Sequence, residues 1–299
     1  TNYFETMPSN QLETTLWLEA DRMGYFLDAV TEEKFEIQRD AVKNEKEQIQ
    51  INVPYGMFFT GEIVGETLYP KGHPYSWPVI GYVDDLDRVT VNDLKDFFKR
   101  WYGPNNAYLV VAGDVITSEV IALANKYFGP IPRGEEVRDL RVPRVNLPQN
   151  KYRKFADQIY FPLAAFVYPT VPNYHKDEPA LDILADLMGA GNNSPFYQSF
   201  VKTEKAVQAY VQHPCSELAG EFTIAVMSYP EYTFAEVEEE IYKLVDNFEE
   251  HITEKGIEQY KSKKRSSITD VLSSVQGKAS TLTQWAYLLD DPFNLTNEL

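Results

Sequence analysis

The stretch on which the fold assignment depends begins at Thr31, ends at Pro54 and reads TEEKFEIQRDAVKNEKEQIQINVP. Thr31 suits the N-cap of a helix, because its hydroxyl can accept a hydrogen bond from a free backbone N–H of the first turn. Pro54 cannot continue a helix, because its ring removes a backbone donor. The stretch therefore predicts one helix that runs from Glu32 to about Ile51.

One carboxylate of this helix, that of Glu45, is predicted to face the core. At about 100° per residue, Glu45 falls in the middle of an apolar stripe along the helix. The stripe consists of Phe35, Ala41, Val42 and Ile49. A carboxylate in that position needs a cation or a metal ion to compensate its desolvation. The alternative is a solvated glutamate on a highly charged helix, which is the usual environment of this residue type.

The composition is that of a folded protein with an acidic surface. The chain has 299 residues, of which 43% are hydrophobic and 14% aromatic, so it can fill about two cores. The net charge of -17 must then be spread over folded surface. A negative field of this kind disfavours nucleic acid and anionic membranes as partners. No run of 18 apolar residues occurs, and we expect no membrane insertion of this segment.

The single cysteine, Cys215, excludes an internal disulfide and any Cys-rich metal cluster. It fits a reducing cytosol and a disulfide-free periplasm equally well. The cysteine count therefore does not decide the compartment. We expect the bacterial periplasm.

The periodicity of apolar residues predicts helices and strands on both sides of the quoted stretch. In residues 1–140 we expect strands at 3–7 and 107–112 and helices at about 10–26, 90–101 and 116–128. In residues 151–299 we expect strands near 159–168, 206–212 and 221–227. The helices expected there are 178–188, 234–251, 256–275 and a shorter one ending at 289.

A segment rich in proline and glycine divides the chain. Residues 130–148 show no sustained period, which is typical of a domain linker. We therefore predict domains at 1–140 and 151–299, with the linker at 141–150.

The predicted fold class is α+β. The strand, turn and helix of residues 107–128 have the same layout as residues 221–248, so the two domains are expected to be similar. Each is expected to be a mainly antiparallel sheet backed by helices.

The histidines do not form a metal-binding motif. They are far apart and show neither H-x-x-H nor H-E-x-x-H spacing, so no complete zinc site is predicted within this chain. Cys215 lies two residues from His213, but such a pair must be arranged in space, and a lone cysteine is more often a small buried hydrophobe. The four histidines are His73, His175, His213 and His251.

Several short motifs follow one another in a recognisable order. They are Thr1-Asn2-Tyr3-Phe4, Glu19-Ala20-Asp21-Arg22-Met23, Gln38-Arg39-Asp40-Ala41-Val42-Lys43-Asn44-Glu45, His73-Pro74-Tyr75, Ile80-Gly81, Trp101-Tyr102, Pro104-Asn105-Asn106-Ala107 and Gly113-Asp114. This order is similar to that of the insulinase (pitrilysin-type) family of zinc metallopeptidases over most of residues 1–130. Residues 150–299 resemble the second domain of that family more loosely.

The resemblance implies a zinc site built on the inverted motif H-x-x-E-H, in which two histidines bind zinc and the glutamate activates a water. Those residues, the general base included, are expected upstream of Thr1, in a parent protein of which this chain is a fragment truncated at both ends. The resemblance carries the third ligand, a glutamate on a later helix, onto Glu45 alone. Catalytic members commonly carry a supporting glutamate seven residues earlier, where this chain has Gln38, which can hydrogen-bond but adds no charge.

The family's substrate-binding Arg and Tyr, found in the partner half, have no match here. The corresponding place holds Lys202 and Tyr210, and neither the residue types nor the spacing fits. The resemblance therefore implies that this half supplies the metal ligand. A second homologous half, on the same chain or in a separate subunit, would supply the substrate clamp.

The resulting hypothesis is a zinc-dependent metalloendopeptidase that cleaves peptides or small unfolded proteins and holds one zinc ion per intact site. The fragment by itself is expected to be inactive and to lack tightly bound zinc, because one carboxylate is a poor site. The alternative is a catalytically silent family member that holds peptides or serves an assembly, since fold alone does not establish activity.

Overall fold

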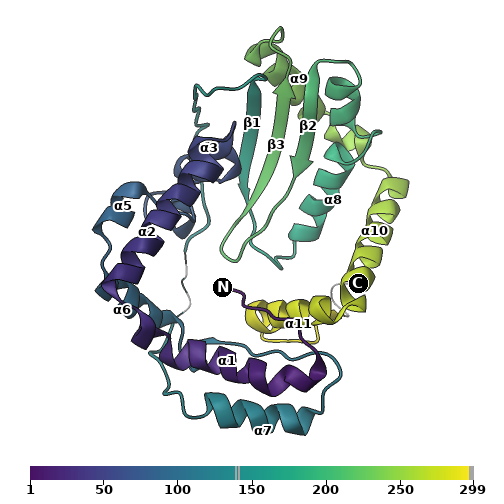
Figure 1. Ribbon diagram of the computed structural model, residues 1–299. Coiled ribbons are helices and arrows are strands. Elements are labelled where there is room, and N and C mark those ends of the chain that lie inside the picture. Colours follow the sequence, from purple (N-terminus) through teal and green to yellow (C-terminus); the bar gives the residue numbers. More distant parts are fainter. Residues whose placement is uncertain (139, 141, 296–299) are drawn as a thin grey trace. The chain divides into compact units, whose positions relative to one another are not determined.

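The structure is a computed structural model that describes residues 1–138, 140 and 142–295 (Figure 1). Helices dominate it, and the strands of the described residues form one three-stranded antiparallel sheet. This arrangement confirms the predicted α+β class. None of the described helices is both long and apolar enough to cross a membrane.

The chain divides into two compact units, and each unit collects segments that are distant in sequence. Unit 1 comprises Thr1–Val42, Val83–Leu140 and Lys264–Leu299, and unit 2 comprises Lys43–Tyr82 and Arg141–Lys263. These units do not follow the sequence limits of 1–140 and 151–299. The changes from one unit to the other at Val42 and Lys263 fall inside helices, where no change of composition marks them. That the two halves are copies of one unit stays a prediction.

Unit 1 is helical. Its elements are η1 (Ser9–Gln11), α1 (Leu12–Tyr25), η2 (Phe26–Ala29), most of α2 (Glu32–Lys46), α5 (Val83–Arg88), α6 (Val91–Trp101), η5 (Pro104–Asn106), α7 (Thr117–Phe128), the end of α10 (Glu254–Ser273) and α11 (Val275–Leu289). Helices α1 and α7 lie side by side (Figure 1), and Glu13 of α1 accepts hydrogen bonds from Lys126 Nζ (2.8 Å) and the Tyr127 hydroxyl (2.7 Å) of α7. Thr90 caps α6 through a reciprocal bond with Asp93.

The prediction of two strands in this unit is wrong. Residues 3–7 and 107–112 pair with no other strand in the described part of the chain. Their residue types suit a strand, but a strand needs a neighbour that takes up its backbone hydrogen bonds. The described residues do not offer one.

Unit 2 contains the sheet. Its strands are β1 (Leu163–Thr170), β2 (Ala206–Gln212) and β3 (Gly220–Ser228), and β3 lies between the other two (Figure 1). The antiparallel register aligns Phe166 with Ile224 and Ile224 with Val211. The helical elements are η3 (Glu47–Ile51), α3 (Gly56–Phe59), α4 (Glu62–Leu68), η4 (Pro74–Ser76), α8 (Glu178–Gly189), η6 (Tyr197–Val201), α9 (Phe234–Asp246), η7 (Phe248–His251) and the first part of α10.

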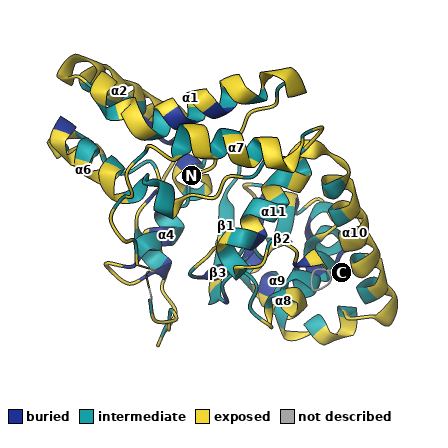
Figure 2. Cartoon of the chain, turned by 90° about the horizontal axis from the view of Figure 1, so that it is seen from below, coloured by how far each residue is buried: buried dark blue, intermediate teal, exposed yellow. Residues whose placement is uncertain are grey.

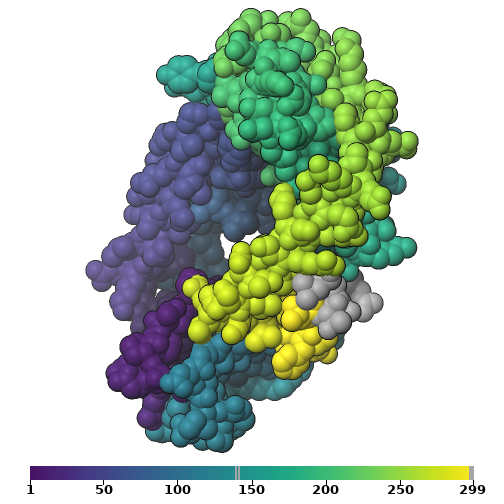
Figure 3. Space-filling view, turned by 90° about the vertical axis from the view of Figure 1, so that its right-hand side faces the viewer, coloured from purple at the N-terminus to yellow at the C-terminus, as the bar shows by residue number. Residues whose placement is uncertain are grey.

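The sheet is packed on both of its faces within unit 2. On one face, Ile224 and Val226 contact a buried cluster that includes Met188 of α8 and Ile241 of α9. On the other face, residues of α4 and its C-terminal end form a smaller cluster around Leu68, packed against Val167 and Ala219. Within the sheet the buried residues lie mainly in the central strand β3, and β1 has none. Figure 2 also shows buried positions on α1 and α2. Helix α10 has no buried residue, and in Figure 3 its yellow-green surface faces the viewer.

Replacing Ile241 with Ala is expected to destabilise unit 2 by about 2–5 kcal/mol, because its fully buried side chain would leave a cavity. Urea unfolding followed by circular dichroism measures the change. Ile252→Ala is the control, since Ile252 is 42% exposed. A variant at Ile241 as stable as the wild type would contradict this assignment of the core.

Candidate functional site

Helix α2 carries the predicted metal ligand, and its buried face differs from the predicted one. Lys46 is buried, and Phe35, Arg39 and Val42 are half-buried. These residues recur at intervals of three or four, which places them on one face of a helix. Glu45 lies beside that face and is exposed. The prediction that Glu45 faces the core is therefore wrong.

The reason is that the buried face of α2 contains two cations, which a hydrophobic stripe does not reveal. The Arg39 guanidinium packs over the Phe35 ring and donates to the backbone oxygens of Asp87 and Val89, at the end of α5. Lys46 Nζ donates to Glu62 Oε2 at 3.0 Å and to the Gly81 oxygen at 2.9 Å. A buried cation is tolerable when it is paired and hydrogen-bonded in this way.

The partners of Lys46 form a buried polar network between η3 and α4. Gln50 Nε2 donates to Glu62 Oε2 at 2.7 Å and to Thr60 Oγ1 at 2.9 Å, which uses both amide protons. The Thr60 hydroxyl donates in turn to the Gly56 oxygen at 2.8 Å. A Cβ at Gly56 would lie 2.2 Å from the Gln50 oxygen, so the close approach of these turns requires glycine.

This network fixes the direction of Glu45. Glu45 directly precedes Lys46, so anchoring the Lys46 side chain sets the rotation of the last turn of α2. Among the described residues, the Glu45 carboxylate has neither a hydrogen bond nor an ion pair. The helix thus presents a free carboxylate to solvent.

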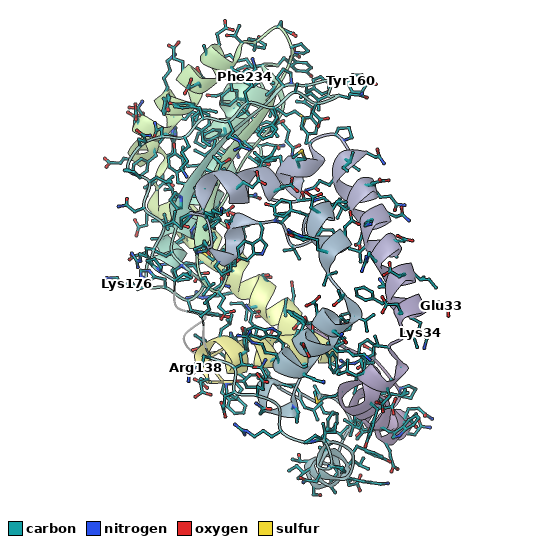
Figure 4. The ribbon with its side chains drawn as sticks, turned by 90° about the vertical axis from the view of Figure 1, so that its left-hand side faces the viewer. Glu33, Lys34, Arg138, Tyr160, Lys176 and Phe234 are labelled. Carbon is teal, nitrogen blue, oxygen red and sulfur yellow. The ribbon has the colours of Figure 1, made fainter. Side chains whose placement is uncertain are left out.

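Gln38, Lys202 and Tyr210, which the family resemblance singled out beside Glu45, are also at the surface or half-buried. Gln38 lies two turns before Glu45 on the same side of α2 and is exposed. Lys202 is exposed, and its Nζ donates to Gln198 Oε1 at 2.9 Å. Tyr210 is half-buried in β2. At the start of α2, Glu33 and Lys34 point outward (Figure 4).

The described residues do not fit a complete zinc centre. They contain no group of three or more His, Cys, Asp or Glu side chains able to hold a metal ion. Protein zinc sites take three or four protein ligands. Glu45 could contribute one ligand, and the remaining ones would have to come from elsewhere.

A second cluster, which sequence reasoning did not assemble, lies at one end of the sheet. The fully buried imidazole of His213 bonds through Nδ1 to Asp182 Oδ1 (2.7 Å) and through Nε2 to Thr170 Oγ1 (2.9 Å). Cys215 Sγ lies 3.6 Å from His213 Nε2 and donates to the Val171 oxygen. The two-residue spacing of His213 and Cys215 was the only signal in the sequence.

The chemistry of this cluster is structural. Burial, together with the carboxylates of Glu178 and Asp182, raises the pKa of Cys215 to about 12. A reactive cysteine needs a lowered pKa, because the thiolate is the nucleophile. The thiol therefore stays protonated at neutral pH, in agreement with the interpretation of Cys215 as a small buried side chain.

A third cluster joins the segment after α4 to the start of β3. The Tyr69 hydroxyl donates to Glu221 Oε1 at 2.9 Å, and the Tyr69 ring stacks on His73 at 4.6 Å. Burial raises the pKa of Glu221, which the bond from Tyr69 opposes in part, and burial lowers the pKa of His73. His73 Nδ1 accepts from the Tyr75 N–H, while its Nε2 is buried without a partner among the described residues. Burial thus disfavours the charged form of both Glu221 and His73.

Comparison with known proteins finds relatives along most of the chain. The sequence profile of a family described as Peptidase M16 inactive domain matches residues 88–264. The zinc protease PqqE of Helicobacter pylori is 27% identical over 280 residues, which cover 92% of this chain and 62% of that protein. The mitochondrial-processing peptidase subunit beta of Caenorhabditis elegans is 26% identical over 156 residues, 52% of this chain and 32% of that protein. The chain thus spans less than two thirds of these curated relatives.

The solved structures include a protease from Helicobacter pylori that resembles this chain in fold. It superposes with a TM-score of 0.81 at 26% sequence identity, covering 98% of this chain and 70% of that one. The helices and the small sheet described above are therefore arranged as in that structure.

Replacing Lys46 with Met is expected to destabilise the protein by about 3–5 kcal/mol, because Glu62 would remain buried without its cation. The double variant Lys46→Met, Glu62→Gln should recover most of this loss, since no unpaired charge remains. Chemical unfolding measures both, with Lys71→Met at an exposed lysine as control. Equal stability of the single and double variants would contradict the proposed role of the pair.

Replacing Glu221 with Gln is expected to change how stability depends on pH. A carboxyl whose folded pKa lies above its ordinary value of 4.5 contributes stability below that value and loses it as pH rises through the folded pKa. Gln stays neutral and can still accept the hydrogen bond from Tyr69. The variant should therefore gain stability relative to the wild type as the pH rises from 4 to 8.

Thermal unfolding midpoints across this range test the expectation. Glu231→Gln, at an exposed position, is the matched control and should show no such gain. A constant difference between Glu221→Gln and the wild type at all pH values would contradict a raised pKa of Glu221 in the folded protein.

Proposed function

Because the chain belongs to the peptidase M16 family, as its insulinase-type motifs predicted, we propose that it is part of a zinc-dependent metalloendopeptidase. Its 299 residues contain no H-x-x-E-H sequence. The two histidine ligands and the general base would therefore come from residues outside this chain. The support is the zinc protease PqqE of Helicobacter pylori, which matches 92% of the chain.

The observation that carries the proposal is the free carboxylate of Glu45 on an anchored helix. Its neighbour Lys46 is tied to Glu62 and Gly81, whereas Glu45 has no internal partner among the described residues. A ligand needs both qualities, because its position must be held while its oxygen atoms stay available. In the whole protein Glu45 would supply the third protein ligand, and Gln38 would lie near enough along the same side of α2 to support it.

The proposed substrates are peptides or small unfolded proteins. The proposed partner is a second homologous half, which would complete the enclosure around the substrate. A relative of this chain is named as a subunit, the mitochondrial-processing peptidase subunit beta of Caenorhabditis elegans, which supports a paired arrangement. Lys202 and Tyr210 do not form a substrate clamp of the family type, so this half would contribute the metal ligand.

A second candidate function is a catalytically silent half that holds peptides. The specific observation in its favour is the description of the matching family as an inactive domain, over residues 88–264. Glu45 lies outside that range, so both functions are compatible with the match. They differ in whether Glu45 takes part in metal binding.

We also propose the bacterial periplasm as the compartment. The support is that the zinc protease PqqE, a relative over 92% of this chain, is from a bacterium, and the free Cys215 is compatible with this compartment. Periplasmic and cytosolic fractions of the source cells, probed with an antibody to this chain, would test the location.

Replacing Glu45 with Gln in the whole protein is expected to lower zinc retention and peptide cleavage by about tenfold or more, with the fold unchanged. Glu47→Gln is the matched control, since Glu47 is exposed two residues further on. Metal analysis and cleavage of a quenched, unstructured peptide give the two readings. The isolated 299-residue chain should show neither tight zinc binding nor cleavage.

Wild-type zinc content and turnover in Glu45→Gln would remove Glu45 from the site. A whole protein that binds peptides but neither retains zinc nor cleaves them would favour the silent alternative.

A further inference from the structure

Unit 2 contains a cavity of about 280 Å³ between its sheet and its helices. It is lined from three sides: by Leu184 and Met188 of α8, by Val211 and Ile224 of the sheet, and by Val245 and Phe248 at the end of α9 and the start of η7. The surrounding core is densely packed, with Phe196, Val226 and Ile241 fully buried. Protein cores hold few spaces larger than a water molecule, so this one, which is open to solvent on one side, is a candidate binding site.

The cavity wall is almost entirely apolar. The hydroxyl of Thr170, which contributes to the wall, is already bonded to His213 Nε2 at 2.9 Å. Tyr168 also lines the cavity and is 40% exposed, which places it at the mouth. A ligand would thus have a path from solvent, and the interior would offer it almost only apolar contacts.

We propose that this cavity binds a compact, purely apolar group of about the size of a bicyclic aromatic ring. A dry cavity of about 150 Å³ lined by Leu, Ile and Phe binds benzene, and this cavity is nearly twice as large. The occupant restores the dispersion contacts that the lining side chains lack when the space is empty. The proposal concerns unit 2 alone and does not depend on the zinc site.

The scarcity of polar atoms in the wall sets the specificity, because the Thr170 hydroxyl is already bonded to His213 and Tyr168 lies at the mouth. A ligand N–H or O–H would leave water without gaining a partner, which costs binding free energy. Naphthalene should therefore bind more tightly than 2-naphthol, which has a similar shape but carries a hydroxyl. The free molecule and an apolar side chain of a peptide share this chemistry as sources of the occupant.

The test is a titration of the 299-residue chain, carrying isotope-labelled methyl groups, with naphthalene. Saturable shifts are expected at the methyl signals of Leu184, Val211 and Ile224, with at least fivefold weaker binding of 2-naphthol. Val245→Phe, which fills the cavity, should lower naphthalene affinity at least tenfold. Val207→Phe, at a 41% exposed position of β2, is the matched control and should not change it.

A milder filling variant, Val211→Leu, keeps the proposal testable if Val245→Phe does not fold, and it should weaken binding at least threefold. Displacement of naphthalene by a short peptide with a naphthylalanine side chain would assign a peptide as the source, and no displacement would assign a free molecule. The proposal is overturned if naphthalene gives no saturable shifts at these methyl groups, or if folded filling variants bind it as the wild type does.

Discussion

The buried ion pair between Lys46 and Glu62 is the interaction on which the candidate site depends. Taking both charges out of water is costly, and the cost is met by close contact and by further bonds to Gly81 and Gln50. Such a pair tolerates little displacement, because either charge alone would be uncompensated. It therefore fixes the end of α2 against α4 and, through the helix backbone, the direction in which Glu45 points.

The same anchor connects to the sheet of unit 2. Helix α4 begins at Glu62 and ends at Leu68, whose side chain packs in the cluster on the second sheet face. Directly after it, Tyr69 bonds to Glu221 of β3. A polar network at one end of a short helix and an apolar cluster at the other thus hold the turn that carries Glu45 relative to a rigid sheet.

Sequence patterns were sufficient to predict an element where a local signal, such as a helix cap or a run of strand-forming residues, sets its limits. The helices expected at 90–101 and from 234 begin as predicted, capped by Thr90 and Thr233, and the strand at 206–212 has the predicted limits. The motif order identified the family. The buried side of α2 was beyond such patterns, because Arg39 and Lys46 are usually surface residue types and become core residues only through partners far along the chain.

The strands expected at 3–7 and 107–112 did not form for a related reason, and the limits of the compact units were not predictable from local patterns either. Strand pairing and compact packing depend on neighbours distant in sequence, and the unit changes within α2 and α10 leave no local mark. The sequence did contain a signal for the buried face of α2, the helically spaced residues Phe35, Arg39, Val42 and Lys46. It is recognised only when cations are accepted as residues of a buried face.

The most direct measurement is a crystal structure of the whole protein with zinc bound. We predict a Glu45 carboxylate oxygen within about 2.2 Å of the zinc ion, with Lys46 still paired to Glu62. A zinc ion held by other residues, with the Glu45 carboxylate in solvent, would contradict it.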